Sequence, residues 1–267
     1  MRRRKGYADG PDGQIHYLIC GEGPPVVLSH QSPSSLHQFD AVLEPLATAG
    51  FQAIAVDTPG FGQSDVPSSP PSIADYAAAL VAVLDALGIA AAHGVGHHTG
   101  AMVINEAAVQ YPDRWRKIVL NGPVPFTKQE SDGWRDYALT FERAWRPKPD
   151  GSHLMEIWDR RTNGTKGWTS LEGMHRSVVD WIAAGTTGWY GHNAAFDYDQ
   201  AAALMKITRP CLILTNTGDG VYDLALRARD MRPDFAFAAL EGGTHDIIDE
   251  QPEAWTETVV SFLRDAA

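Results

Sequence analysis

The feature that most constrains the fold is an alternation of short apolar runs with helical patterns, separated by turns rich in glycine and proline. The apolar runs are residues 14–20, 26–29, 51–56, 93–96, 117–121, 211–216 and 235–240. From Val26 onward most of them are apolar throughout, which is typical of strands buried on both faces. Strands that alternate with helices predict a mostly parallel sheet flanked by helices, and 267 residues suffice for one such α/β domain.

Three helices are predicted from the signals at their ends. Ser72 and Asp75 have the spacing of a capping box ahead of an apolar stripe. A second helix is expected over residues 99–111, where Pro112 stops it. The last helix is expected to begin near Pro252, which suits a first helical turn.

The alternation breaks between Pro123 and about Met205, where the pattern becomes mostly helical and unusually aromatic. This stretch holds six of the eight tryptophans, at positions 134, 145, 158, 168, 181 and 189. We expect residues 123–205 to form a helical cap, inserted into a sheet core made of residues 1–122 and 206–267. Most of the tryptophans should build the core of the cap. One or two should face a cleft, because a cap presents apolar area to whatever it covers.

Charge limits the classes of partner. The chain has 22 Lys+Arg against 33 Asp+Glu, a net charge of −11, which repels phosphate backbones and anionic lipid. We therefore expect no nucleic acid and no membrane as partners. A small-molecule substrate is expected, and the chain is expected to be a monomer or homodimer. No stretch approaches 18 consecutive apolar residues.

The N-terminal residues and the two cysteines indicate the cellular compartment in which the protein is expected to reside. The basic run at residues 2–5 is not followed by an apolar region, so we expect a solvated, frayed start rather than a signal peptide. Cys20 and Cys211 each lie in a strand-like run and cannot build a disulfide framework. Their number is consistent with a reducing cytoplasm.

The most informative stretch is GVGHHTG at residues 94–100, between an expected strand and an expected helix. Gly96 and Gly100 flank His98 by two positions on each side. This is the spacing of the nucleophile elbow, G-x-S-x-G, in which a sharp turn lifts one side chain above the sheet at a helix N-terminus. Small residues are needed on both sides because the strand and the helix approach closely.

Four further segments follow in a matching order. They read VVLSHQSP at 26–33, DTPGFGQSD at 57–65, LILTNTGD at 212–219 and EGGTHD at 241–246. Together with the elbow they resemble the α/β-hydrolase superfamily, in particular its capped members such as epoxide hydrolases, haloalkane dehalogenases, C–C bond hydrolases and cofactor-free esterases. The resemblance covers nearly the whole chain apart from the cap, and it implies the α/β-hydrolase fold.

The resemblance also implies roles for individual positions. Asp219 matches the acid of the catalytic triad and His245 matches its histidine, in the chain order that the family uses. No Asp or Glu occupies residues 121–126, the alternative position of the acid. The backbone N–H groups of Thr99 and Ser32 match the two donors of the oxyanion hole.

The sequence departs from the family at the site itself. The nucleophile position holds His98, and the usual His-Gly pair after the third strand is His30-Gln31. Gln31 either points its amide into the cleft or tolerates a strained backbone. We expect Gln31, His30 and Trp189 to contribute to substrate binding, although His30 is also expected to hold loops together beneath the site. His192 is expected to be a surface histidine rather than one that reaches down from the cap.

An imidazole on the elbow already carries a lone pair in its neutral form, so it needs no separate base. The positive end of the helix disfavours a second positive charge there. If Asp219 hydrogen-bonds His245, a shared proton prefers His245, and we expect His98 to be mainly neutral at pH 7. The two imidazoles are then expected to titrate as a coupled pair.

Three functions remain open for a small apolar or aromatic carbonyl, ester or lactone ligand. His98 attacks as a covalent nucleophile and forms an acyl-imidazole that is then hydrolysed. In the favoured alternative, His98 and His245 act as acid and base without a covalent intermediate, in hydrolysis by activated water, C–C cleavage, decarboxylation or isomerisation. In the third, which the retained Asp219 and His245 disfavour, the cleft only binds a small molecule.

No cofactor is expected. The chain has no G-x-G-x-x-G between a strand and a helix and no Walker sequence, so nucleotide cofactors are not indicated. His30, His97, His98 and His245 could crowd one cleft, and imidazoles are zinc ligands. We nevertheless disfavour a metal, because His97 should point away from the elbow residue and His30 should be structural.

Overall fold

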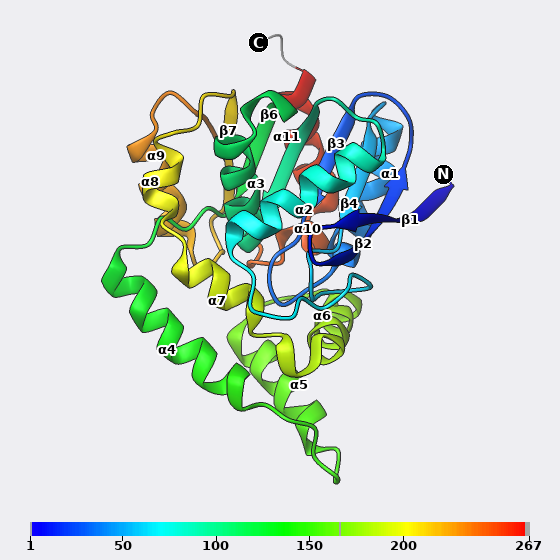
Figure 1. Cartoon of the computed structure of the whole chain (residues 1–267). Helices are drawn as coiled ribbons and strands as arrows, with labels where there is room; N and C mark the ends of the chain where they lie inside the picture. The colour runs from blue at the N-terminus through cyan, green and yellow to red at the C-terminus, as the bar shows by residue number, and fades with distance from the viewer. Residues whose placement is uncertain (1, 166, 265–267) are drawn as a thin grey trace.

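The computed structural model describes residues 2–165 and 167–264, which are organised around one central sheet (Figure 1). Its strands are β1 (Arg3–Gly10), β2 (Gly13–Cys20), β3 (Pro25–Ser29), β4 (Gln52–Val56), β5 (Ala92–His97), β6 (Trp115–Asn121), β7 (Cys211–Asn216) and β8 (Ala236–Leu240). They are ordered β1-β2-β4-β3-β5-β6-β7-β8 across the sheet. The pairs β1–β2 and β2–β4 are antiparallel, and the remaining neighbours are parallel. The predicted mostly parallel sheet is confirmed, and each predicted strand agrees with an observed one to within two residues at either end.

Helices cover both faces of this sheet. On one face lie α2 (Ile73–Ala86), α3 (Thr99–Gln110) and α9 (Tyr222–Met231), and on the other lie α1 (Asp40–Thr48), α10 (Ile247–Glu250) and α11 (Pro252–Arg264). The two faces have separate hydrophobic cores, one around Tyr76 and Leu80 and the other around Trp255 and Val259. This layered arrangement confirms the predicted α/β-hydrolase fold.

The predicted helix ends are confirmed. The side chain of Ser72 accepts a hydrogen bond from the N–H of Asp75, and the carboxylate of Asp75 accepts one from the N–H of Ser72, which completes the capping box of α2. Helix α3 ends at Gln110, just before Pro112, and α11 begins at Pro252. Sequence patterns did not indicate α1, α9 or α10.

The expectation of a frayed N-terminus was wrong. The basic run continues into β1, an edge strand that pairs along its whole length with β2, from Arg3 opposite Cys20 to Gly10 opposite Gly13. The guanidinium of Arg3 also donates to the carboxylate of Asp40 at 2.7 Å. The basic side chains remain solvated, but backbone pairing fixes the chain, and an edge strand needs little apolar patterning.

A helical segment separates β6 from β7. We call it the α4–α8 segment: α4 (Lys128–Ala144), α5 (Ser152–Gly164), α6 (Leu171–Ala184), α7 (Tyr190–Asp197) and α8 (Gln200–Leu204). Helices α4 to α7 gather at one end of the sheet (Figure 1). The segment has a small core of its own, formed by Trp145, Ile157, Val178 and Trp181.

Two further predictions can be compared with the described residues. Among them, no helix combines the length and hydropathy that crossing a membrane requires. Cys20 and Cys211 are both buried and form no disulfide.

Candidate active site

The turn between β5 and α3 has the geometry of an elbow. His98 adopts φ 46° and ψ −106°, a conformation that strains any residue with a Cβ. A Cβ on Gly96 would lie 2.0 Å from the carbonyl oxygen of Gly100, and a Cβ on Gly100 would lie 1.9 Å from that of Ser29. Only glycine fits at these two positions, so the backbone is built to present the side chain of His98.

His98 lies in the wall of a cavity of about 540 Å³, a size suited to a small organic molecule. The cavity lies between the sheet and the α4–α8 segment, as its lining shows. The apolar lining includes Met102, Val124, Phe126, Trp134, Tyr137 and Trp181. The titratable lining comprises His98, His192, His245, Asp219, Arg160 and Arg161. Trp134 and Trp181 thus face the cavity, as expected for one or two of the tryptophans.

The carboxylate of Asp219 is bonded to His98 rather than to His245. The Nε2 atom of His98 lies 2.9 Å from Oδ2 of Asp219, whose side chain is fully buried. Burial by itself would raise the pKa of Asp219, but the His98 imidazole and a hydrogen bond from the N–H of Val221 hold it well below its usual range. The expected pairing of Asp219 with His245, and the proton sharing built on it, are therefore wrong.

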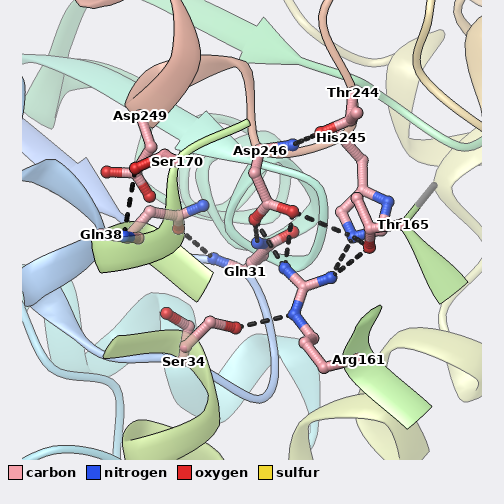
Figure 2. A network of polar contacts seen from close by, with 12 residues as sticks. Gln31, Ser34, Gln38, Arg161, Thr165, Ser170, Thr244, His245, Asp246 and Asp249 are labelled. Atoms are coloured by element: carbon pink, nitrogen blue, oxygen red, sulfur yellow. Dashed lines mark hydrogen bonds and ion pairs between the residues drawn. The ribbon is translucent and has the colours of Figure 1, made fainter. Parts of the chain in front are cut away.

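His245 belongs to a different network, shown in Figure 2. Its Nε2 atom lies 2.7 Å from Nη1 of Arg161 and 3.3 Å from Oγ1 of Thr165. Nη2 of Arg161 also donates to both carboxylate oxygens of Asp246, each at 2.6 Å. A guanidinium only donates, so Nε2 of His245 must accept and the ring is neutral. Burial lowers the pKa of His245 to about 4, although the carboxylate of Asp246, 3.4 Å from Nε2, acts to raise it; the charge of Arg161 adds to the lowering.

His97 lies directly beside the ring of His98. The two ring centroids are 4.2 Å apart, and His97 is completely buried. Its Nδ1 atom lies 2.6 Å from Nε2 of Gln38, whose own Oε1 accepts a hydrogen bond from the N–H of Gln31. The amide nitrogen therefore donates, and His97 accepts. Burial lowers the pKa of His97 well below its usual value. His97 is therefore a neutral ring that packs against the ring of His98.

Both expected oxyanion positions lie at the cavity. Ser32 and Thr99 line it together with His98. As the first residue of α3, Thr99 has no acceptor for its N–H within the helix. Among the described residues, the N–H of Ser32 donates to no other group. Two residues of the lining thus have backbone N–H groups without an acceptor among the described residues.

Known proteins share the fold of this chain. A family model described as the alpha/beta hydrolase fold matches residues 24–235. The chain belongs to the α/β-hydrolase family. It is 36% identical over 303 aligned positions to an epoxide hydrolase of Caballeronia sordidicola, with 94% of this chain and 90% of the relative covered.

Other matches are shorter or show the fold alone. Bifunctional epoxide hydrolase 2 of Mus musculus is 37% identical over 119 residues, which cover 42% of this chain but only 21% of that longer protein. The crystal structure of a bromoperoxidase from Bacillus anthracis superposes with a TM-score of 0.83 at 22% identity, covering 98% of this α/β hydrolase and 100% of the other chain.

Two residues expected to bind substrate in this α/β hydrolase lie elsewhere. Nδ1 of His30 contacts the carbonyl oxygen of Gln31 at 2.7 Å, and its Nε2 accepts a hydrogen bond from the N–H of Thr58 at 3.0 Å. Both nitrogens are occupied in joining two loops, so His30 has the structural role and does not line the cavity. Trp189 packs against Tyr190 and under the guanidinium of Arg143, also outside the lining.

Two other residues reach the cavity. Gln31 lines it, and its side-chain amide donates to Oδ1 of Asp246 at 3.0 Å, which ties the loop after β3 to the network of Figure 2. His192 lines it as well, with Nδ1 lying 2.8 Å from the buried carboxylate of Glu142. The expectation that His192 lies on the surface was therefore wrong, because α7 turns this residue inward.

Sequence reasoning missed Arg160, Arg161 and Thr165. All three come from α5 or the residue that follows it, and all three line the cavity. The available signal was two adjacent arginines in an aromatic segment of a strongly acidic chain. Within the part of the chain that the structure describes, no group of three or more His, Cys, Asp or Glu side chains is placed to hold a metal ion.

Proposed function

We propose that this α/β hydrolase cleaves a small carbonyl, ester or lactone substrate with His98 and Asp219 as its reacting pair. The observation that carries the proposal is the 2.9 Å hydrogen bond between these residues at the elbow, in the wall of the cavity. We also propose that residues 123–205 act as the cap of the site, supported by the cavity lining that the α4–α8 segment contributes.

The hydrogen bond determines which atom of His98 can react. Nε2 donates to the carboxylate of Asp219, so the lone pair of the neutral ring lies on Nδ1. We propose that Nδ1 takes a proton from a water molecule while the water oxygen attacks the substrate carbonyl carbon. Asp219 then stabilises the positive charge that develops on the imidazole.

The remaining steps use other groups of the cavity lining. The N–H groups of Ser32 and Thr99 are proposed to hold the oxyanion as negative charge develops on the carbonyl oxygen. When the tetrahedral intermediate collapses, the leaving oxygen takes the proton from Nδ1 of His98, which restores the neutral ring. An acyl-imidazole would require the same nitrogen to attack the carbonyl directly, so the two routes share one reactive atom.

His245 has a different proposed role. Its Nε2 atom is occupied by Arg161, and its lowered pKa of about 4 keeps the ring neutral at pH 7. We therefore assign it as a positioning residue that links the loop after β8 to α5, rather than as the base. The aromatic lining supports an apolar or aromatic substrate body, and the two buried, unbridged cysteines support a cytoplasmic location.

The test is turnover of a panel of small aryl esters, thioesters and lactones by the parent chain and by His98→Ala. Loss of a positioned base typically costs about 10²–10⁴-fold, and we expect a fall of this size in kcat/KM. His37→Ala is the matched control, because His37 is bonded to Asp40 and does not line the cavity.

Two outcomes contradict the proposal. Equal rates for His98→Ala and the parent remove His98 from the reaction. If no substrate in the panel is turned over while aryl ligands still bind in the cavity, the chain is a small-molecule binding protein. Mass spectrometry of the enzyme during turnover separates the two hydrolytic routes, since only the covalent one adds an acyl group to His98.

A further inference from the structure

Arg160 presents an unusual cation to the cavity. It lies on α5, and its guanidinium carbon is 4.5 Å from the ring centroid of Phe141, 5.1 Å from that of Tyr137 and 6.0 Å from that of Trp181. Aromatic faces hold a guanidinium by cation–π attraction and fix its plane, but they leave its N–H groups without acceptors.

The other charged groups of the lining are already paired. Arg161 is bonded to Asp246, Asp219 is bonded to His98, and His192 lies against Glu142 at 2.8 Å. Arg160, by contrast, forms no ion pair or hydrogen bond with any residue that the structure describes. Arg160 is therefore the charged side chain of the lining whose N–H groups have no acceptor among the described residues, in a chain with a net charge of −11.

We propose that Arg160 binds a carboxylate group of the substrate, which makes this site selective for carboxylate-bearing molecules with an apolar or aryl body. A guanidinium matches a carboxylate because two parallel N–H groups can donate to its two oxygens. The rings of Phe141 and Tyr137 hold the cation in place before the ligand arrives, which reduces the entropy lost on binding. The proposal deepens the proposed function, but it concerns binding and can be tested without turnover.

The experiment compares two probes of nearly equal shape, 3-phenylpropanoate and its neutral amide, 3-phenylpropanamide. Binding is followed by indole fluorescence, since Trp134 and Trp181 line the cavity. We expect the parent chain to bind the carboxylate at least about tenfold more tightly than the amide. Arg160→Gln should abolish this preference, and Arg160→Lys should retain part of it because the charge remains.

Arg143→Gln is the matched control. Arg143 also lies over an indole, 4.5 Å from the centroid of Trp189, but it donates to Asn193 and does not line the cavity. This variant should keep the full preference for the carboxylate. Circular dichroism of each variant checks that the fold is intact. If Arg160→Gln does not fold, the affinities of the parent chain and of Arg160→Lys for the two probes still test the role of Arg160.

The outcomes separate this proposal from the proposed function. His98→Ala is expected to lose hydrolysis but to retain the preference for the carboxylate probe. Equal affinity of the parent chain for both probes overturns the role of Arg160, whatever the rates show. Retention of the full preference in a folded Arg160→Gln variant overturns it as well.

Discussion

Two imidazoles line one cavity, yet the groups bonded to them carry opposite charges. Nε2 of His98 faces the carboxylate of Asp219 at 2.9 Å, whereas Nε2 of His245 faces the guanidinium of Arg161 at 2.7 Å. A carboxylate stabilises a proton on the imidazole beside it, and a guanidinium disfavours one. The ring centroids are only 5.8 Å apart, so the hydrogen-bond partner distinguishes the two rings. At His245, burial and the charge of Arg161 outweigh the carboxylate of Asp246, which lies 3.4 Å from Nε2.

The two pairs also differ in the parts of the molecule that build them. His98 and Asp219 both come from the sheet core, at the end of β5 and in the loop after β7. The His245 network joins the loop after β8 to α5 in the α4–α8 segment. The reacting pair is therefore held by the core alone, and the segment acts on the neighbouring histidine through Arg161.

The largest expected effect comes from breaking the first pair. Asp219→Asn removes the charge that stabilises a protonated His98 but keeps the shape of the side chain. We expect kcat/KM to fall by about 10³-fold on the best ester of the panel, while ligand binding is retained. Asp223→Asn, an exposed acid on α9, is the control and should retain the parent rate. A rate for Asp219→Asn within threefold of the parent would remove this pair from the mechanism.

Removing Arg161, which bonds both His245 and Asp246, should lower the free energy of unfolding. Arg161→Met removes the cation paired with Asp246 and leaves the amide of Gln31 bonded to a carboxylate whose side chain is only 3% exposed. Removing one partner of a buried ion pair costs about 3 kcal/mol of unfolding free energy, measured by urea denaturation. The control is Arg227→Met, whose pair with Glu130 is more than a third exposed and should cost under about 1 kcal/mol. Equal losses in the two variants would show that Arg161 is not the buried link described above.

The smallest expected effect is the contribution of His245 to the pH dependence of the unfolding free energy. His245 has a pKa of about 4 in the folded chain and about 6.5 when unfolded, so the unfolded state alone takes up a proton as the pH falls between these values. Unfolding free energy should therefore fall from pH 6.5 to pH 4, with this group contributing on the order of 2 kcal/mol. His245→Gln should show a smaller fall over this range.

His37→Gln provides the contrast for that titration. Hydrogen bonding to Asp40 raises the pKa of His37, so this residue adds stability at low pH that is lost as the pH rises through its folded-state value. Replacing it should steepen the fall in stability on acidification rather than reduce it. A parent chain and a His245→Gln variant with the same pH dependence would contradict the assignment of a neutral His245.

Local sequence patterns predicted the sheet and the elbow, because each depends on a strand end and a few neighbouring residues. The resemblance to the family singled out Asp219 and His245, and both line the cavity. Edge strand β1 was missed, since it needs little apolar patterning once its backbone pairs with β2. The hydrogen-bond partners of His98 and His245 could not be predicted from the sequence either. Arg161 contacts His245 across 84 positions of the chain, and this contact depends on how α5 packs over the sheet core.

The division of roles between His98 and His245 is tested most directly by ¹⁵N NMR of the histidine side chains, with His98→Gln and His245→Gln used to assign the two rings. At pH 7 we expect a neutral His245 with its proton on Nδ1, unchanged until the pH approaches 4, and a proton on Nε2 of His98. A His245 that is cationic at pH 7, or that carries its proton on Nε2, would contradict the division of roles between the two rings.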